Sequence, residues 1–240
     1  MSIIVFQHWN LGKPGRLGLT LRDHGFRLDI RRLDSGDAVP QDYDNVEAVV
    51  SLGGPQNVGD PIPWMAAEMD YLKGAHARAI PVIGVCLGHQ LIAASLGGTV
   101  AKMPAPELGM VEVSITPAGH TDPILAGIAW KSRQFQSHGY EVTQPPPDSV
   151  VLASSPSCKV QAMRVGMRTY GFQYHFELDR ESANEYMAQE GPEACASAGV
   201  TMDAYRQSMD RHYEMFSRLA DRLCVNLATL LIPRVASKVG

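Results

Sequence analysis

The sequence has little of what marks a secreted, membrane-bound or metal-binding protein. It contains four cysteines in 240 residues, far apart and without a Cys-x-x-Cys pair. That spacing disfavours a zinc site or a disulfide framework, so we expect no metal and a reducing, cytoplasmic environment. No apolar run approaches the ~20 residues of a membrane-spanning helix, and no basic region precedes the apolar N-terminus. We therefore predict neither a signal peptide nor a membrane partner.

An excess of basic charge is also lacking. The net charge is -4 at pH 7, and no run of basic residues occurs. Proteins that bind nucleic acid need a positive surface, so we predict no nucleic-acid partner. The sequence also has neither a phosphate-binding loop of the Walker type nor a Ser-Gly-Gly-x-Asp-Ser loop. We therefore expect that the chain does not activate a substrate with ATP by itself, and we predict no cofactor.

What the first half does contain is an alternation of strand and helix patterns. The predicted strands are residues 3–6, 26–33, 46–52 and 82–85, and the predicted helices between and after them are residues 14–24, 63–78 and 87–96. This order predicts an α/β fold with a mostly parallel, doubly wound sheet and helices on both faces. Ligands of such sheets bind beyond the carboxyl ends of the strands, where both Gly53-Gly54 and Cys86 lie.

The second half changes to short strand patterns separated by turn signals, of which His138-Gly139 is one. The strands are expected at residues 111–116, 132–137, 150–154, 159–165 and 169–174, and they predict an antiparallel extension of the sheet. A helix is expected to begin at Asp179 and to end at Gly191-Pro192, and Thr201 is expected to open a long amphipathic helix. We interpret the chain as a single domain with a core of residues 1–180 and a helical extension of residues 181–240. The last helix is expected to cover the core rather than a partner, although an oligomer stays open.

Cys86 stands between Gly84 and Gly88, where a predicted strand meets a predicted helix. Gly-x-Cys-x-Gly in this setting is the pattern of a nucleophile elbow, whose glycines avoid clashes across the tight turn. A helix N-terminus stabilises a thiolate, and its free N–H groups can hold an oxyanion. A lone cysteine is equally consistent with a small buried hydrophobic residue. The choice between these readings depends on a partner for the thiol.

The candidate partner lies in residues 171–177. His175 ends a strand pattern, and Glu177 follows two residues later, on the same face of an extended segment. A carboxylate that orients an imidazole is a common means of activating a nucleophile. A His-x-Glu pair is by itself more often structural. Together with the Cys86 elbow and the Gly53-Gly54-Pro55 loop, it predicts a Cys-His-Glu active site.

Four segments of the sequence resemble the class I (triad) glutamine amidotransferases, most closely the glutaminase part of GMP synthetase and its stand-alone relatives. The segments are Gly53-Gly54-Pro55, residues 84–90, Ser137-His138-Gly139 and residues 173–177. The resemblance covers residues 1–180, and the order and spacing of all four segments match. It departs at Phe176, where many members have proline, and we expect this change to alter only the turn.

The resemblance implies a flavodoxin-like amidotransferase fold and a role for each matching residue. Cys86 is then the nucleophile, His175 the general base and acid, and Glu177 the residue that orients His175. The oxyanion hole falls on the backbone N–H groups of Gly54 and Leu87. The residues implied to hold the amino-acid end of the substrate are Gln90 and, through backbone segments, Glu107, Gly109, Ser137, His138 and Gly139.

We therefore predict hydrolysis of the γ-amide of glutamine through a γ-glutamyl thioester on Cys86, with ammonia passed to a separate synthetase. The second hypothesis is a hydrolase of γ-glutamyl peptides or amides that has no acceptor protein. The third is a binding module with a lapsed site. The fourth is a chaperone- or glyoxalase-like protein, which takes its histidine from just after the cysteine. Here His89 lies three residues on, within a predicted helix, and is expected to help pack the substrate loop. For His138, bracing of a turn competes with contact to substrate.

Overall fold

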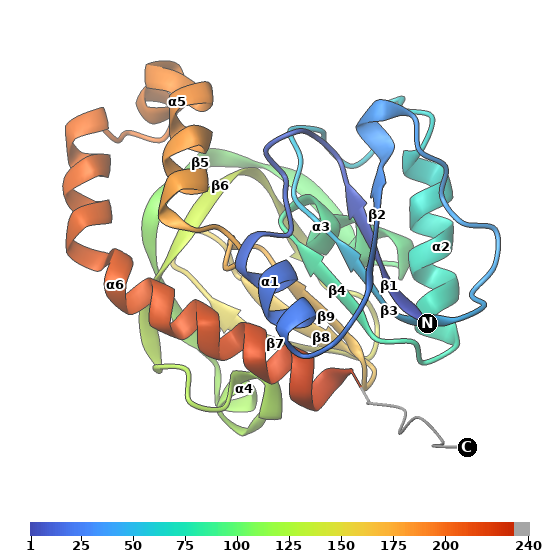
Figure 1. Ribbon diagram of the computed structural model, residues 1–240. Helices are drawn as coiled ribbons and strands as arrows, with labels where there is room; N and C mark the ends of the chain where they lie inside the picture. The colour runs from blue at the N-terminus through green and yellow to red at the C-terminus, as the bar shows by residue number, and fades with distance from the viewer. Residues whose placement is uncertain (233–240) are drawn as a thin grey trace.

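The computed structural model describes residues 1–232, without the side chains of residues 190–192, and within this range one sheet forms the centre of the protein (Figure 1). Its strand order is β2-β1-β3-β4-β9-β8-β7-β5-β6. The strands are β1 Ser2–Gln7, β2 Leu28–Arg32, β3 Val46–Ser51, β4 Val82–Val85, β5 Thr99–Ile115, β6 Lys131–Gln144, β7 Ser149–Ser154, β8 Ala162–Val165 and β9 Thr169–Phe172. The strands from β2 to β9 in this order pair parallel, and the others pair antiparallel. The parallel sheet and its antiparallel extension are both confirmed.

Helices cover both faces of the parallel part. They are α1 Gly15–Asp23, α2 Met65–Ala77, α3 Leu87–Ser95, α4 Pro117–Thr121, α5 Arg180–Ser197 and α6 Met202–Asn226, and short helical turns are η1 Leu33–Ser35, η2 Pro123–Leu125 and η3 Leu227–Leu231. Because side chains alternate along a strand, Ile3 and Val5 join the apolar cluster under α1 and α6, whereas Ile4 and Phe6 join the cluster under α2 and α3. Burial on both faces explains the continuous apolar runs of these strands.

The antiparallel part is built around a hairpin that is much longer than predicted. Strands β5 and β6 extend well beyond residues 111–116 and 132–137. The register of the β5–β6 pair shifts between Lys102 and Glu107. Pro104 and Pro106 lie in this interval, where an irregular strand pairing tolerates residues that have no backbone N–H to donate. The prediction of a turn at His138-Gly139 was wrong, because His138 is paired with Glu107 inside the hairpin.

From its position in the sequence, strand β9 was expected to belong to the antiparallel series alone, and this expectation was wrong. It pairs parallel with β4 on one side and antiparallel with β8 on the other, so it joins the two halves of the sheet. The carboxyl ends of β1, β3, β4 and β9 therefore meet at one edge. His8, Gly53-Gly54, Cys86 and Gln173 follow these four ends.

The C-terminal helices pack on the core. Asp179 caps α5 by accepting a hydrogen bond from Ser182 N, and Thr201 caps α6 in the same way. The predicted end at Gly191-Pro192 was wrong: α5 continues to Ser197, since a proline removes one donor and redirects a helix without always ending it. The α6 helix lies along α1 and contributes to the core, as expected (Figure 1). Residues 233–240 of the predicted extension lie outside the described residues.

Within residues 1–232, no helix is both long and apolar enough to cross a bilayer. The same part of the chain holds no group of three or more histidine, cysteine or acidic side chains arranged for a metal ion.

Candidate active site

The turn between β4 and α3 holds Cys86 in a backbone conformation that is rare for residues other than glycine. Its φ is 51° and its ψ is -105°, which indicates local strain of a kind that clusters at functional sites. The flanking glycines are required for close packing. A Cβ atom at Gly88 would overlap the carbonyl of Ser51, and one at Gly84 would lie 2.6 Å from the carbonyl oxygen of Gly88. The elbow geometry predicted from the sequence is therefore present.

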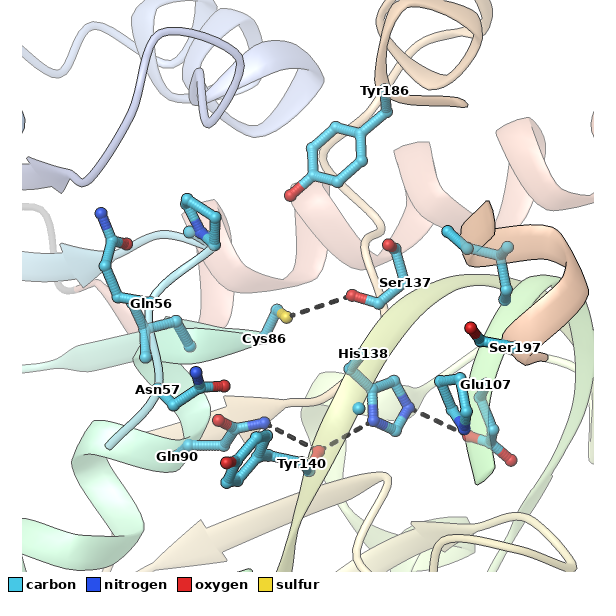
Figure 2. Close-up of a pocket in the computed structure, with 17 residues that line it drawn as sticks. Gln56, Asn57, Cys86, Gln90, Glu107, Ser137, His138, Tyr140, Tyr186 and Ser197 are labelled. Carbon is cyan, nitrogen blue, oxygen red and sulfur yellow. Dashed lines mark hydrogen bonds and ion pairs between the residues drawn. The ribbon is translucent and has the colours of Figure 1, made fainter. Parts of the chain in front are cut away.

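The Cys86 thiol opens onto a cavity of about 410 Å³ at the carboxyl edge of the parallel strands. Although the residue is only 5% exposed, its side chain reaches the cavity wall, where the thiol donates a weak hydrogen bond of 3.8 Å to the Ser137 carbonyl (Figure 2). The cavity volume lies in the range of small-molecule sites. Cys86 is thus at once packed in the fold and open to a ligand.

His175 and Glu177 form a buried pair beside this thiol. His175 Nδ1 donates to Glu177 Oε1 at 2.7 Å, and both side chains are almost fully buried. His175 Nε2 has no hydrogen-bond partner of ordinary geometry within residues 1–232. A Cβ atom at Gly53 would lie 2.7 Å from His175 Cε1 and 3.5 Å from Cys86 Cβ, so the two side chains meet at this glycine. The structure brings Cys86, His175 and Glu177 together.

The surroundings of His175 favour its protonated form. Burial lowers the pKa of the imidazole, but the negative charge of Glu177, the Cys86 side chain and the hydrogen bonds to both outweigh burial and raise the pKa above its ordinary value of 6.5. A cation beside a thiol stabilises the thiolate. The arrangement therefore places a protonated imidazole, which is a proton donor, beside the side chain of Cys86.

Two backbone N–H groups at the cavity are free to bind an oxygen. Those of Gly54 and Leu87 make no hydrogen bond within the described part of the chain, and both residues line the cavity. Leu87 begins α3, so its N–H belongs to the first helical turn, which has no partner inside the helix. These N–H groups are suited to hold an oxyanion near Cys86.

Most of the residues expected to hold the substrate reach the cavity. Those that line it are Gln90, Glu107, Ser137, His138 and Gly139, whereas Gly109 is not among the lining residues. The Gln90 amide donates to the Tyr140 carbonyl at 2.9 Å and to Gln173 Oε1 at 3.1 Å. Gln90 is thus held in one orientation at the wall.

The side chains of Glu107 and His138 are fully occupied by other protein groups. Four side chains donate to the Glu107 carboxylate: His138 at 3.0 Å, Ser155 and Gln161 at 2.6 Å each, and Ser157. His138 Nδ1 contacts the Tyr140 carbonyl at 2.9 Å. Burial raises the pKa of Glu107, but the hydrogen bonds of His138 and the two serines lower it overall. These two side chains brace the hairpin, although the turn assumed for His138 is absent.

His89 does not take the place of a catalytic histidine. Its ring is fully buried, contacts the Val160 carbonyl at 3.1 Å and packs against Gly171. Burial and the nearby His138 lower its pKa to about 3, so the ring is neutral. This geometry fits a packing role.

Several cavity residues were missed by the sequence analysis, and the most prominent is Tyr186 of α5. Its hydroxyl points into the cavity, and its ring lies 5.4 Å from that of His175 (Figure 2). Ser197, near the end of the same helix, also lines the cavity. No motif marks these two residues; only the packing of α5 against the hairpin brings them here.

Comparison with known proteins identifies the family that the chain resembles. The family model described as "Glutamine amidotransferase class-I" matches residues 17–191. The chain is 38% identical over 143 residues to a glutamine-hydrolyzing GMP synthase subunit of Sulfolobus acidocaldarius, in a match that covers 59% of this chain and 73% of that protein. It is 30% identical over 203 residues to the glutamine amidotransferase-like protein YfeJ of Salmonella typhimurium. This match covers 82% of this chain and 84% of that protein. A solved glutamine amido transferase from Methylobacillus flagellatus superposes with a TM-score of 0.85 at 25% identity, over 94% and 93% of the chains.

Proposed function

This chain belongs to the class I glutamine amidotransferase family, and we propose that it hydrolyses the γ-amide of glutamine through a γ-glutamyl thioester on Cys86. The observation that supports this most directly is the meeting of the Cys86 thiol with the buried His175–Glu177 pair. In this proposal His175 transfers protons through Nε2, and Glu177 keeps the ring oriented by accepting from Nδ1.

The first half of the reaction forms the thioester. The Cys86 thiolate attacks the carbon of the γ-amide, and the carbonyl oxygen takes up negative charge. The N–H groups of Gly54 and Leu87 stabilise this charge, each by about 3 kcal/mol in the transition state. The C–N bond then breaks while His175 gives its proton to the leaving nitrogen, so ammonia departs and the acyl group stays on sulfur.

The second half releases glutamate. A water molecule takes the place left by ammonia and gives a proton to the now neutral His175. The resulting hydroxide attacks the thioester carbon, the oxyanion forms again at the same N–H groups, and the C–S bond breaks. The products are the γ-carboxylic acid of glutamate, which then gives its proton to solvent, the Cys86 thiolate and the imidazolium of His175. The two side chains are thus back in the starting state.

We further propose that the ammonia serves a separate synthetase subunit. The support is the similarity to proteins whose names describe them as one subunit of GMP synthase, and hence as part of a larger enzyme. Co-purification of this chain with a synthetase, together with glutamine-dependent amination by the complex, is the expected result.

A second candidate is hydrolysis of γ-glutamyl amides or peptides without an acceptor protein. The observation that favours it is that Tyr186 and Ser197 of α5 form part of the cavity wall. This helix follows, in the sequence, the segments that carry Cys86, His175 and Glu177. Turnover of a panel of γ-glutamyl dipeptides by the isolated chain, compared with glutamine, decides between the two. Faster turnover of the dipeptides supports the hydrolase.

The proposed chemistry is tested by removing the sulfur. We expect Cys86→Ala and Cys86→Ser to fold but to release no glutamate, because neither forms the thioester. Mass spectrometry of the wild-type chain quenched in acid during turnover should show a γ-glutamyl adduct on Cys86 that both variants lack. Glutamate release by Cys86→Ala at the wild-type rate excludes Cys86 from the reaction.

A further inference from the structure

We propose that a second buried pair, His8 with Glu68, holds the Gly53-Gly54 loop so that the Gly54 N–H faces the reacting carbonyl. His8 and Glu68 are not among the residues that line the cavity, so both are positioning residues rather than catalytic ones. The inference rests on the proposed function, because it concerns the charge that develops when Cys86 attacks an acyl carbon.

The pair ties together three elements of the fold. His8 follows β1, Glu68 lies in α2, and both side chains are fully buried. His8 Nε2 contacts Glu68 Oε2 at 2.8 Å, and the hydroxyl of Ser51, at the end of β3, donates to Glu68 Oε1 at 2.6 Å. The His8 ring also stacks on Trp64, with the ring centroids 4.9 Å apart. One carboxylate thus fixes the ends of two adjacent strands.

The same histidine touches the loop that supplies one oxyanion donor. A Cβ atom at Gly54 would lie 2.8 Å from His8 Cβ, and the Gln56 amide donates to the His8 carbonyl at 3.0 Å. Burial lowers the pKa of His8, but the charge of Glu68, its hydrogen bond and the backbone carbonyls of Gly53 and Leu52 raise it overall. In a trans peptide the C=O and N–H groups point in opposite directions. A Cβ atom at Gly12, which is not among the residues that line the cavity, would lie 2.7 Å from the Gly53 oxygen, so the Gly54 N–H of the same peptide points away from Gly12.

The network also reaches the second donor. The Ser51 carbonyl is the group that excludes a side chain at Gly88, and Gly88 N donates to the Leu52 carbonyl at 3.1 Å. Gly88 is the neighbour of Leu87 in the first turn of α3. Ser51 and Leu52 therefore connect the Glu68 carboxylate to both N–H groups of the oxyanion hole.

A purely structural role does not account well for this pair. Burying two ionisable side chains costs desolvation energy, and apolar side chains of similar volume often stabilise a fold equally well or better. What apolar residues cannot do is hold neighbouring segments in one position through directed hydrogen bonds, as Glu68 does for His8 and Ser51. Oxyanion donors must be aimed before the reaction begins, and small displacements at an active site lower the rate strongly.

The test compares two reactions of the same thiol. Acylation by glutamine needs the oxyanion hole, whereas alkylation of Cys86 by iodoacetamide forms no oxyanion. In His8→Gln and Glu68→Gln we expect kcat to fall by about 10- to 100-fold with KM unchanged. The rate of alkylation should stay at the wild-type value. Labelling by a diazoketone analogue of glutamine, whose carbonyl enters the same hole, should slow in parallel with kcat.

A matched control is available on the same helix. His76 of α2 contacts Thr169 Oγ1 at 2.8 Å and does not line the cavity, so His76→Gln should change none of the three rates. Where a His8 or Glu68 variant does not fold, Ser51→Ala removes one hydrogen bond of the network and should show the same split between acylation and alkylation.

Two outcomes overturn the inference. In the first, kcat and diazoketone labelling are unchanged in folded variants. In the second, acylation and alkylation fall by the same factor, which indicates a general loss of structure. Failure of the proposed function is recognised separately, because Cys86→Ala then retains glutamate release whatever the His8 variants do.

Discussion

Two histidine–glutamate pairs beside the cavity have nearly the same geometry but different connections. The distance from His175 Nδ1 to Glu177 Oε1 is 2.7 Å, and the distance from His138 Nε2 to Glu107 Oε2 is 3.0 Å. All four side chains are almost completely buried. They differ at the remaining ring nitrogen. His138 Nδ1 faces the Tyr140 carbonyl, whereas His175 Nε2 has no ordinary partner within residues 1–232 and lies beside the thiol.

The difference shows that pairing with a carboxylate does not by itself identify a catalytic histidine. In the His138 pair every polar atom of the ring is bonded to protein, so the pair can only stabilise the hairpin. In the His175 pair one ring nitrogen is left beside the Cys86 thiol, as the proposed proton transfer requires. The His8–Glu68 pair lies between these two cases, since its second nitrogen lacks an ordinary partner within the described residues but neither side chain lines the cavity.

The comparison is tested most severely by removing each imidazole in turn. We expect His175→Gln to lower kcat/KM for glutamine by about 10⁴-fold or more, because the proposed proton donor and base is lost. His138→Gln should stay within about tenfold of wild type, since it disturbs only the position of the wall. Steady-state assays of both folded variants measure this. Equal losses in the two variants contradict the distinction between the pairs.

A smaller effect is expected from Glu177→Gln, about 10³-fold in kcat, and it carries a pH signature. The charge of Glu177 helps to raise the pKa of His175, and burial acts in the opposite direction. The neutral amide therefore lowers this pKa, and the imidazolium that protonates the leaving nitrogen is lost at a lower pH. The alkaline limb of the profile of kcat/KM against pH should move toward lower pH. A reduced rate with an unmoved alkaline limb argues against this role of Glu177.

The smallest effect on catalysis and the clearest effect on folding are expected at Glu107. Glu107→Gln should lower the free energy of unfolding by about 3 kcal/mol at neutral pH, because a buried charge network is broken. The pKa of Glu107 is lowered in the fold, so its contribution is present above the ordinary value of 4.5 and is lost as the pH falls through the lowered pKa. Urea unfolding at several pH values should show the difference from wild type shrinking in acid.

Glu112→Gln is the matched control on the same strand. Its carboxylate is half exposed and 3.9 Å from Lys131, so we expect a change below about 0.5 kcal/mol. A Glu107 variant as stable as this control contradicts the bracing role.

The local features of the fold could be predicted from the sequence, and the non-local ones could not. The first strands, the helices between them and the turn at Cys86 depend on neighbouring residues, such as the glycines on either side of the thiol. The parallel pairing of β9 with β4 joins segments that are far apart in the chain, and no pattern inside Thr169–Phe172 specifies it. The length of the hairpin was hidden by Pro104 and Pro106, which usually end a strand.

The candidate site follows the same division. Cys86, His175 and Glu177 could be singled out as candidates because each lies in a short motif. The environment of Glu107 was not, since its serine and glutamine partners come from a segment some 50 residues later. Tyr186 was missed for a related reason: its place at the cavity depends on how α5 packs, and helical spacing alone does not reveal that.

The backbone at Cys86 has a consequence for the history of such proteins. A side chain at φ 51° carries strain of about 1–3 kcal/mol, which glycine largely escapes. Selection for a thiol at this position therefore keeps a cysteine in a backbone conformation that favours glycine. In a descendant released from selection for chemistry, a change to glycine relieves that strain. Inactive descendants that keep this architecture are therefore favoured to carry glycine at the elbow, as a trace of the enzyme they once were.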